Sequence, residues 1–152
     1  MKVLLAIDGT EQSDDAIKIV GSLDLNAIDE IRVLTVIDMA LPLAHDIYSG
    51  MMTNTVEIEE AARKAAEASL EETVAQMTEM TAGTDTSITQ TAVVGSPESQ
   101  IVGESENINA DLIIVGSHGY NRWERLLLGS VSDSVIHHAP CSVLVVRSRT
   151  DE

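Results

Sequence analysis

The stretch "IIVGSHGYNRWERLLLGSVSDSV" (residues 113 to 135) leaves an apolar strand at one Gly-Ser and reaches a helix only after a second Gly-Ser. A plain strand-to-helix connection needs about two to six residues, so the 12 residues from Ser117 to Leu128 exceed it. Earlier, "VVGSPESQIV" (93 to 102) makes the same exit directly, with Ser96 as N-cap and Pro97 at the first helical position. The glycines of the longer connection are therefore expected to have a role other than joining a strand to a helix.

Glycines and a helix start in this stretch suggest an anion site. Gly116-Ser117-His118-Gly119 lets a ligand approach backbone that a Cβ would block. Gly129 precedes Ser130, the expected N-cap, and Asp133 follows at a capping-box position. Free N–H groups and the positive end of the helix dipole attract anions at such a start. The two halves together are suited to a polyphosphate.

A purely structural interpretation stays open, in which Gly116 ends a strand, Gly129 enters a helix and Ser130 is an ordinary cap. The charge of the insertion favours the ligand interpretation instead. Arg122 and Arg125 are two of only nine bases in a chain with 25 acids. Positive charge beside a helix N-terminus is expected where an anion binds.

Apolar runs and helical patterns alternate five times along the chain, which predicts one domain over residues 1 to 152. Continuous apolar strands separated by helices indicate an α/β fold, a doubly wound five-stranded parallel sheet that is Rossmann-like, with helices on both faces. The strands are expected at 2–7, 30–37, 87–94, 111–116 and 142–147, and the helices at 10–23, about 55–80, 97–107 and 131–138.

The order of the strands follows from where the unusual motifs lie. The first strand ends "AIDGT", which places Asp8 at its carboxyl end with Gly9 behind it. Ligands of open parallel sheets bind beyond the carboxyl ends, where the winding direction reverses. Strand order 3-2-1-4-5 makes the ends of strands one and four neighbours across that point, whereas 2-1-3-4-5 separates them. The motifs favour the first order.

Composition excludes several classes of partner. A formal net charge of -16 repels nucleic acid and anionic membrane. Only three of the bases are lysines. A surface with so many acids and so few lysines is typical of proteins that are solvated at high salt, so we expect a halophilic source. Cys141, the lone cysteine, excludes an internal disulfide and is interpreted as an inert thiol in a reducing cytosol. Without a signal-like or membrane-length apolar segment, the protein is expected to be cytoplasmic.

The sequence contains no Walker lysine pattern, no G-x-G-x-x-G and no G-x-S-x-G. However, the spacing Gly116-x2-Gly119-x9-Gly129-Ser130, together with "AIDGT" and the closing "CSVLVVR", resembles the ATP-binding branch of the universal stress protein family over essentially the whole chain. Thr10 departs slightly, since the family often has Ser after Asp-Gly. The loop from 38 to 54 matches no useful motif.

The resemblance implies a nucleotide site and a dimer. It implies ATP or a related nucleotide as ligand and a homodimer through the last strand, Ser142 to Val146. The sequence leaves the choice among ATP, ADP, AMP and a cyclic dinucleotide open, and Mg²⁺ is a further candidate beside the phosphates if ATP is hydrolysed. The last strand has no Lys or Pro to discourage edge pairing. The sequence leaves open whether the backbone N–H of Val145 or that of Leu144 points outward. Residue by residue, the family's site maps as follows: Asp8 near adenine and ribose, Val36 at the base, Gly116, His118 and Gly119 at ribose and phosphates, and Gly129, Ser130 and Val131 at the phosphates.

Three functions stay open. The first is a cytoplasmic ATP-binding stress-response regulator that acts as a homodimeric nucleotide sensor. The second is slow ATP hydrolysis, although no residue is assigned to activate water. The third is an interaction protein that binds no nucleotide. His118 is interpreted as a ligand-lining residue rather than a general base, and His137 and His138 as charges near a helix C-terminus rather than a metal pair.

Overall fold

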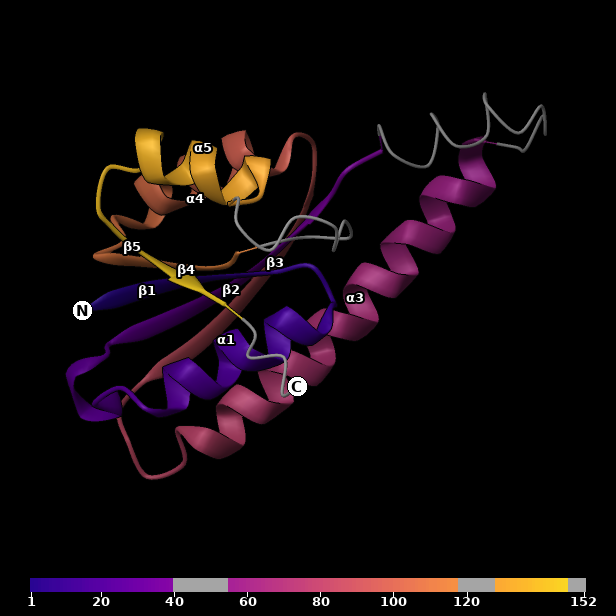
Figure 1. Cartoon of the computed structure of the whole chain (residues 1–152). Coiled ribbons are helices and arrows are strands. Elements are labelled where there is room, and N and C mark those ends of the chain that lie inside the picture. The colour runs from indigo at the N-terminus through magenta and orange to yellow at the C-terminus, as the bar shows by residue number, and fades with distance from the viewer. Residues whose placement is uncertain (40–54, 118–127, 148–152) are drawn as a thin grey trace, which may run out of the picture.

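The computed structural model describes residues 1–39, 55–117 and 128–147, which form a parallel five-stranded sheet flanked by helices (Figure 1). The predicted doubly wound fold is confirmed. The strands are β1 (Lys2–Ile7), β2 (Glu30–Ile37), β3 (Ser87–Val94), β4 (Leu112–Gly116) and β5 (Ser142–Val146). The helices are α1 (Glu11–Gly21), the short 3-10 helix η1 (Leu25–Ala27), α3 (Thr55–Met80), α4 (Pro97–Ile108) and α5 (Ser130–His138).

The strand order is β3-β2-β1-β4-β5, as the motifs predicted. On one side of β1, Ile7 lies opposite Thr35 of β2. On the other side, Val3 lies opposite Leu112 of β4. Because all strands are parallel, their carboxyl ends share one edge of the sheet. The ends of β1 and β4 are neighbours there, where the winding direction reverses and open α/β sheets bind ligands.

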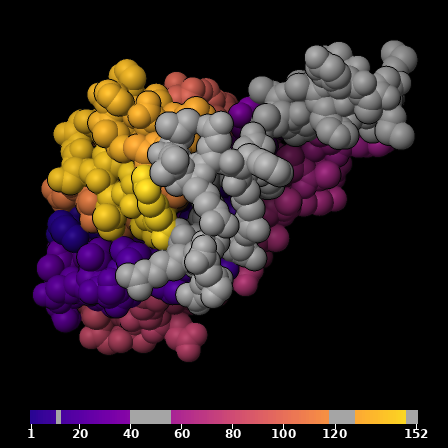
Figure 2. Space-filling view, viewed as in Figure 1, coloured from indigo at the N-terminus to yellow at the C-terminus, as the bar shows by residue number. Residues whose placement is uncertain are grey.

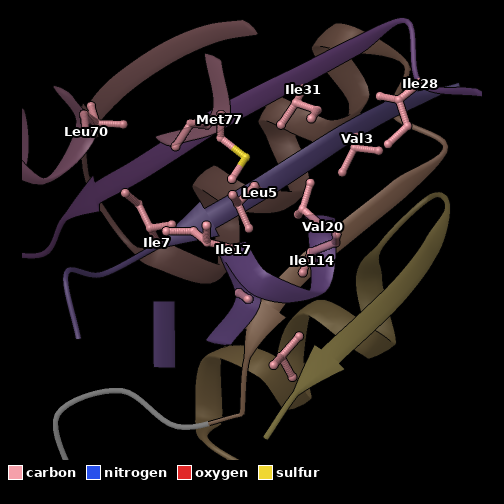
Figure 3. Packing of buried hydrophobic residues seen from close by; sticks show 13 residues of the cluster. Val3, Leu5, Ile7, Ile17, Val20, Ile28, Ile31, Leu70, Met77 and Ile114 are labelled. Carbon is pink, nitrogen blue, oxygen red and sulfur yellow. The ribbon is translucent and has the colours of Figure 1, made fainter. Parts of the chain in front are cut away.

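An apolar layer covers each face of the sheet, because successive residues of a strand point to opposite faces. Leu4 and Leu5 of β1 are both fully buried, one in each layer. Strands buried on both faces explain the continuous apolar runs of the sequence. The layer beneath α1 and α3 includes Val3, Leu5, Ile7, Ile17, Val20, Ile31, Met77 and Ile114 (Figure 3). The layer beneath α4 and α5 includes Leu4, Leu34, Ile101, Ile108, Ile113, Val115 and Val135.

The C-terminal half of α3 packs on the sheet, whereas its N-terminal half extends beyond the body of the molecule (Figures 1 and 2). Leu70 and Met77 are buried, but no side chain from residue 56 to 69 is. On the extended half, Lys64 Nζ lies 3.1 Å from Glu60 Oε1, one turn earlier. Such pairs stabilise an exposed helix by a few tenths of a kcal/mol.

Cys141 is half-buried just before β5, and burial raises the pKa of its thiol, which keeps it protonated and unreactive at neutral pH. This agrees with an inert thiol. Within the three described ranges, no helix has both the length and the apolar composition needed to cross a bilayer.

Candidate functional site

The candidate site lies at the carboxyl edge of the sheet, where β1 and β4 end side by side. Asp8 follows β1, and Gly116 is the last residue of β4. Thr35 pairs with Ile7, so the next residue of β2, Val36, lies beside Asp8 across the sheet. The first turn of α5 begins at Ser130. The topology thus brings together predicted residues that are far apart in the sequence.

Asp8 is exposed, and one of its carboxylate oxygens is bound by its own chain. Oδ1 accepts hydrogen bonds from the Thr10 N–H at 3.0 Å, the Thr10 hydroxyl at 2.6 Å and the Ser13 hydroxyl at 2.9 Å. Among the described residues, no cation pairs with Asp8, and none donates to Oδ2. Asp8 Oδ1 therefore orders the start of α1, a role that the sequence analysis did not predict.

The turn after Asp8 requires glycine. Gly9 has a φ of +74°, in the left-handed region that side chains other than glycine rarely adopt. A Cβ at Gly9 would lie 3.3 Å from Ser69 Oγ of α3. The turn thus brings α3 close to the end of β1.

Ser117 and Gly129, the two ends of the insertion, are held together. The Gly129 N–H donates to the Ser117 carbonyl at 2.8 Å, and the Ser117 N–H donates to the Val146 carbonyl of β5 at 2.8 Å. The residues between them include His118, Gly119, Arg122 and Arg125; residues 118–127 lie outside the described ranges. The insertion therefore begins and ends at one point beside β4 and β5.

The start of α5 differs by one residue from the sequence prediction. Gly129, not Ser130, is the N-cap, with φ -62° and ψ 150°, and no side chain caps the helix. The prediction was wrong because a glycine in an extended conformation can precede the helix as readily as a serine can. The first helical bond runs from the Asp133 N–H to the Gly129 carbonyl at 2.9 Å. The N–H groups of residues 130 to 132 have no partner in the described part of the chain.

Buried hydroxyls around this edge were missed by the sequence reasoning. Ser13, Thr35, Ser117 and Ser132 are each at most 6% exposed. The Thr35 hydroxyl donates to the Ile7 carbonyl at 3.1 Å. The sequence offers one signal for such hydroxyls: each is a small polar residue at a position where the surrounding pattern is apolar.

Val36 and Val131 are half-buried and pack against the apolar layer beneath α4 and α5. An open pocket of about 390 Å³ lies between the ends of β2 and β3 and the start of α4. The Ser96 hydroxyl donates to Glu98 at 2.5 Å and holds the pKa of that carboxyl below its ordinary value. The pocket wall is therefore acidic, and it is formed by Asp38, Met39, Val94, Gly95, Ser96, Pro97 and Glu98.

The two histidines at the end of α5 bind its backbone. His137 Nδ1 lies 2.8 Å from the Asp133 carbonyl, and His138 Nδ1 lies 2.8 Å from the Ser134 carbonyl. Each ring thus lies against a carbonyl one turn earlier in α5, and the interpretation of the two side chains as charges near the helix C-terminus stays a prediction. The described ranges contain no group of three His, Cys, Asp or Glu side chains placed to hold a metal ion.

Comparisons with known proteins agree on one family. The model of the universal stress protein family matches residues 1–147. A Staphylococcus aureus (strain USA300) protein named as a universal stress protein is 33% identical over 149 residues, which is 96% of this chain and 83% of that protein. The solved structure of hypothetical protein MJ0577 superimposes with a TM-score of 0.82 at 27% identity and covers 99% of this chain and 97% of its own.

More distant solved structures share the fold and contain nucleotides. A universal stress protein in complex with cAMP has a TM-score of 0.65 at 24% identity, over 97% of this chain and 96% of that one. Universal stress proteins from Archaeoglobus fulgidus with dAMP and from Arabidopsis thaliana with AMP have TM-scores of 0.64 and 0.63 at 17% and 16% identity. These two alignments cover 96% and 99% of this chain and 97% and 94% of the other chains.

Proposed function

Because the chain belongs to the universal stress protein family, we propose that it binds an adenine nucleotide between the ends of β1 and β4. The first turn of α5 is the observation that carries the proposal. Its N-terminal N–H groups lack partners among the described residues, and Gly129 is tied to the end of β4 through Ser117. Helix starts of this kind bind phosphate. The neighbours that contain cAMP, dAMP and AMP support an adenine nucleotide as the ligand.

In the proposed complex, the nucleotide runs along the carboxyl edge of the sheet. The phosphates meet the first turn of α5, and the sugar and base extend across β1 toward β2. Asp8 Oδ2, which has no partner among the described residues, then accepts a hydrogen bond from the ligand. The full set of proposed binding residues is Asp8, Val36, Gly116, His118, Gly119, Gly129, Ser130 and Val131.

ATP is the proposed nucleotide, with ADP and AMP as alternatives. Arg122 and Arg125 belong to the insertion and offset more than one phosphate charge. A Mg²⁺ ion fits this proposal as a companion of the phosphates, and Asp8 supplies a carboxylate at the end of β1. Slow hydrolysis is a separate property, which phosphate release from bound ATP would reveal.

The direct test is to identify what the protein holds when purified natively. Mass spectrometry of the intact complex should show the mass of an adenine nucleotide, and calorimetry on the emptied protein should show binding of ATP, ADP or AMP but not of GTP. Absence of heat with every adenine nucleotide would contradict the proposed function.

Asp8→Ala should weaken nucleotide binding and also destabilise the start of α1. Loss of a charged hydrogen bond costs about 1.5 to 3 kcal/mol, or roughly 10- to 150-fold in Kd. Asp8→Asn keeps a carbonyl oxygen for Thr10 and Ser13 but loses the charge, so it should retain more stability than Asp8→Ala while still binding weakly. Calorimetry and thermal melts measure the two effects.

The exposed Asp14→Ala variant is the control for this experiment, because it removes an aspartate from α1 away from the end of β1. It should bind like the unmodified protein. If Asp8→Ala melts earlier but binds normally, the carboxylate serves α1 alone.

We further infer a regulatory role in the cytoplasm, with a homodimer that senses the nucleotide. The site is connected to the free edge of the sheet, since Ser117 at the end of β4 bonds to Val146 of β5. A change at the start of the insertion can thus reach the strand through which two copies would pair.

Thermal stability should increase with KCl, as expected of a protein adapted to high salt. The Debye length falls from about 10 Å at 0.1 M to about 3 Å at 1 M, which removes repulsion among the acids. Glu67 and Glu71, exposed one turn apart on α3, are such a pair. If screening contributes about 3 kcal/mol, Tm rises by roughly 6 to 12 °C without nucleotide. Melting in increasing KCl measures this.

The control is the double variant Glu67→Gln, Glu71→Gln, which should melt higher at low salt and gain less from KCl. A Tm that does not change with KCl would contradict adaptation to high salt and leave the fold assignment untouched.

A further inference from the structure

Two buried serines occupy equivalent places on either side of the candidate site. Ser13 lies in the first turn of α1, after β1, and Ser132 lies in the first turn of α5, after β4. They are 6% and 2% exposed. A buried hydroxyl costs free energy unless it is hydrogen-bonded, so its partners indicate what it is for.

Each serine links its helix to the end of the strand before it. The Ser13 hydroxyl donates to Asp8 Oδ1 at 2.9 Å and accepts from the Asp8 N–H at 3.0 Å, so it holds both the backbone and the carboxylate of that residue. The Ser132 hydroxyl lies 3.2 Å from the Ser117 carbonyl and 2.9 Å from the Gly129 carbonyl. It therefore fixes the start of α5 against the end of β4.

Two buried hydroxyls away from the site, those of Ser105 and Thr81, bond differently. The hydroxyl of Ser105, fully buried in α4, donates to the Val102 carbonyl at 2.6 Å, within the same helix. The Thr81 hydroxyl donates to the Met77 carbonyl of α3 one turn earlier, at 2.8 Å. These bonds return to the helix backbone and link no second element. Linking a helix to a strand end distinguishes the two serines at the site.

We propose that Ser13 and Ser132 are positioning residues, which fix the nucleotide-binding groups before the ligand arrives. The inference rests on the proposed function. Ser13 turns the Asp8 carboxylate so that Oδ1 is held by the chain and Oδ2 is left for the nucleoside. Ser132 holds the N–H groups of α5 beside β4, where the phosphates bind. Preorganised groups bind more tightly because less ordering is needed on binding.

The two serines should affect different parts of the ligand. Ser13→Ala should weaken binding of ATP and of adenosine by similar factors, because both contain the nucleoside that meets Asp8. Ser132→Ala should weaken binding of ATP but change that of adenosine little, because adenosine has no phosphate. Loss of one hydrogen bond's worth of positioning corresponds to about 3- to 10-fold in Kd. A general loss of stability would not separate the two ligands in this way.

Ser105→Ala is the matched control, since it makes the same chemical change at a buried serine of α4. Calorimetry with ATP, competition with adenosine, and melting temperatures are measured for the three variants at a temperature where all are folded. The control should lose stability and bind both ligands like the unmodified protein. If an alanine variant does not fold, cysteine replaces alanine, because it fills the same space and bonds only weakly.

The outcomes separate this inference from the proposed function. If the unmodified protein binds neither ATP nor adenosine, the proposed function fails and the inference fails with it. If it binds, but both serine variants bind as tightly as Ser105→Ala does, the serines only support the fold and the inference alone is wrong. Equal losses for both ligands in both variants would also overturn the division between nucleoside and phosphates.

Discussion

Replacing Gly129 by Val is expected to abolish nucleotide binding, with at least about a 100-fold rise in Kd, while the protein still folds. Gly129 is the N-cap of α5 with φ -62° and ψ 150°, a conformation that valine adopts without strain. Valine at this position is a poorer cap than glycine, which costs about 1 kcal/mol. The branched side chain, however, would stand beside the N–H groups that we propose for the phosphates, where an anion must approach closely.

Calorimetry with ATP on the folded variant measures this, with melting to verify the fold. Gly129→Ala should give a smaller loss, because it adds one carbon only. Gly103→Val is the control, since a Cβ at that position in α4 meets no atom within 4 Å. Unchanged affinity in Gly129→Val would remove the start of α5 from the site, and with it most of the functional argument.

The fold was predictable because the central strands are buried on both faces. Such strands are continuous apolar runs, and the expected limits of 2–7 and 30–37 match β1 and β2, while the more polar stretch 87–94 matches the edge strand β3. The strand order followed from a different argument, the need to bring "AIDGT" and the insertion together. Among the described elements, only the short η1 was not expected, because three residues of 3-10 helix leave no periodic pattern.

The candidate site was predicted less completely than the fold. Its position followed from glycines and a helix start, which are local signals. The role of Asp8 at the start of α1 and the buried hydroxyls of Ser13 and Ser132 depend on how elements pack, and a serine in an amphipathic helix carries no mark of its partner. The sequence therefore indicated residues that we propose to meet a ligand, but not the buried hydroxyls that hold Asp8 and the start of α5.

The free edge of the sheet illustrates the same limit, and the structure removes an ambiguity there. The sequence left open whether Val145 or Leu144 points outward from β5. In an extended strand, the N–H and C=O of one residue point to the same side, and those of the next residue to the other. The Val146 carbonyl accepts a hydrogen bond from the Ser117 N–H at the end of β4, so the backbone N–H and C=O groups of Val146 and Leu144 point toward β4. The backbone groups of Val143 and Val145 therefore point toward the open edge.

Replacing Val145 by Pro is accordingly expected to convert the proposed dimer to a monomer. Two copies of β5 that pair antiparallel about a two-fold axis would use the N–H and C=O groups of Val143 and Val145 in a closed interface. Proline removes the Val145 donor from that ladder. Leu144→Pro instead removes a donor to β4, so it should destabilise the protein itself. Light scattering at micromolar concentration and melting distinguish the two effects.

The opposite edge of the sheet supplies the matched control. In β3, the Ser87 N–H donates to the Asp29 carbonyl on the β2 side. The backbone N–H of Gln90, three residues later, therefore points toward the open edge, and the residue is exposed. Gln90→Pro therefore removes an outward donor from the other edge strand and should leave the dimer intact. A Val145→Pro protein that folds and still scatters as a dimer would place the interface elsewhere. A Gln90→Pro monomer would place it on β3, where polar residues alternate along "SITQTAVV" and edge pairing is otherwise disfavoured.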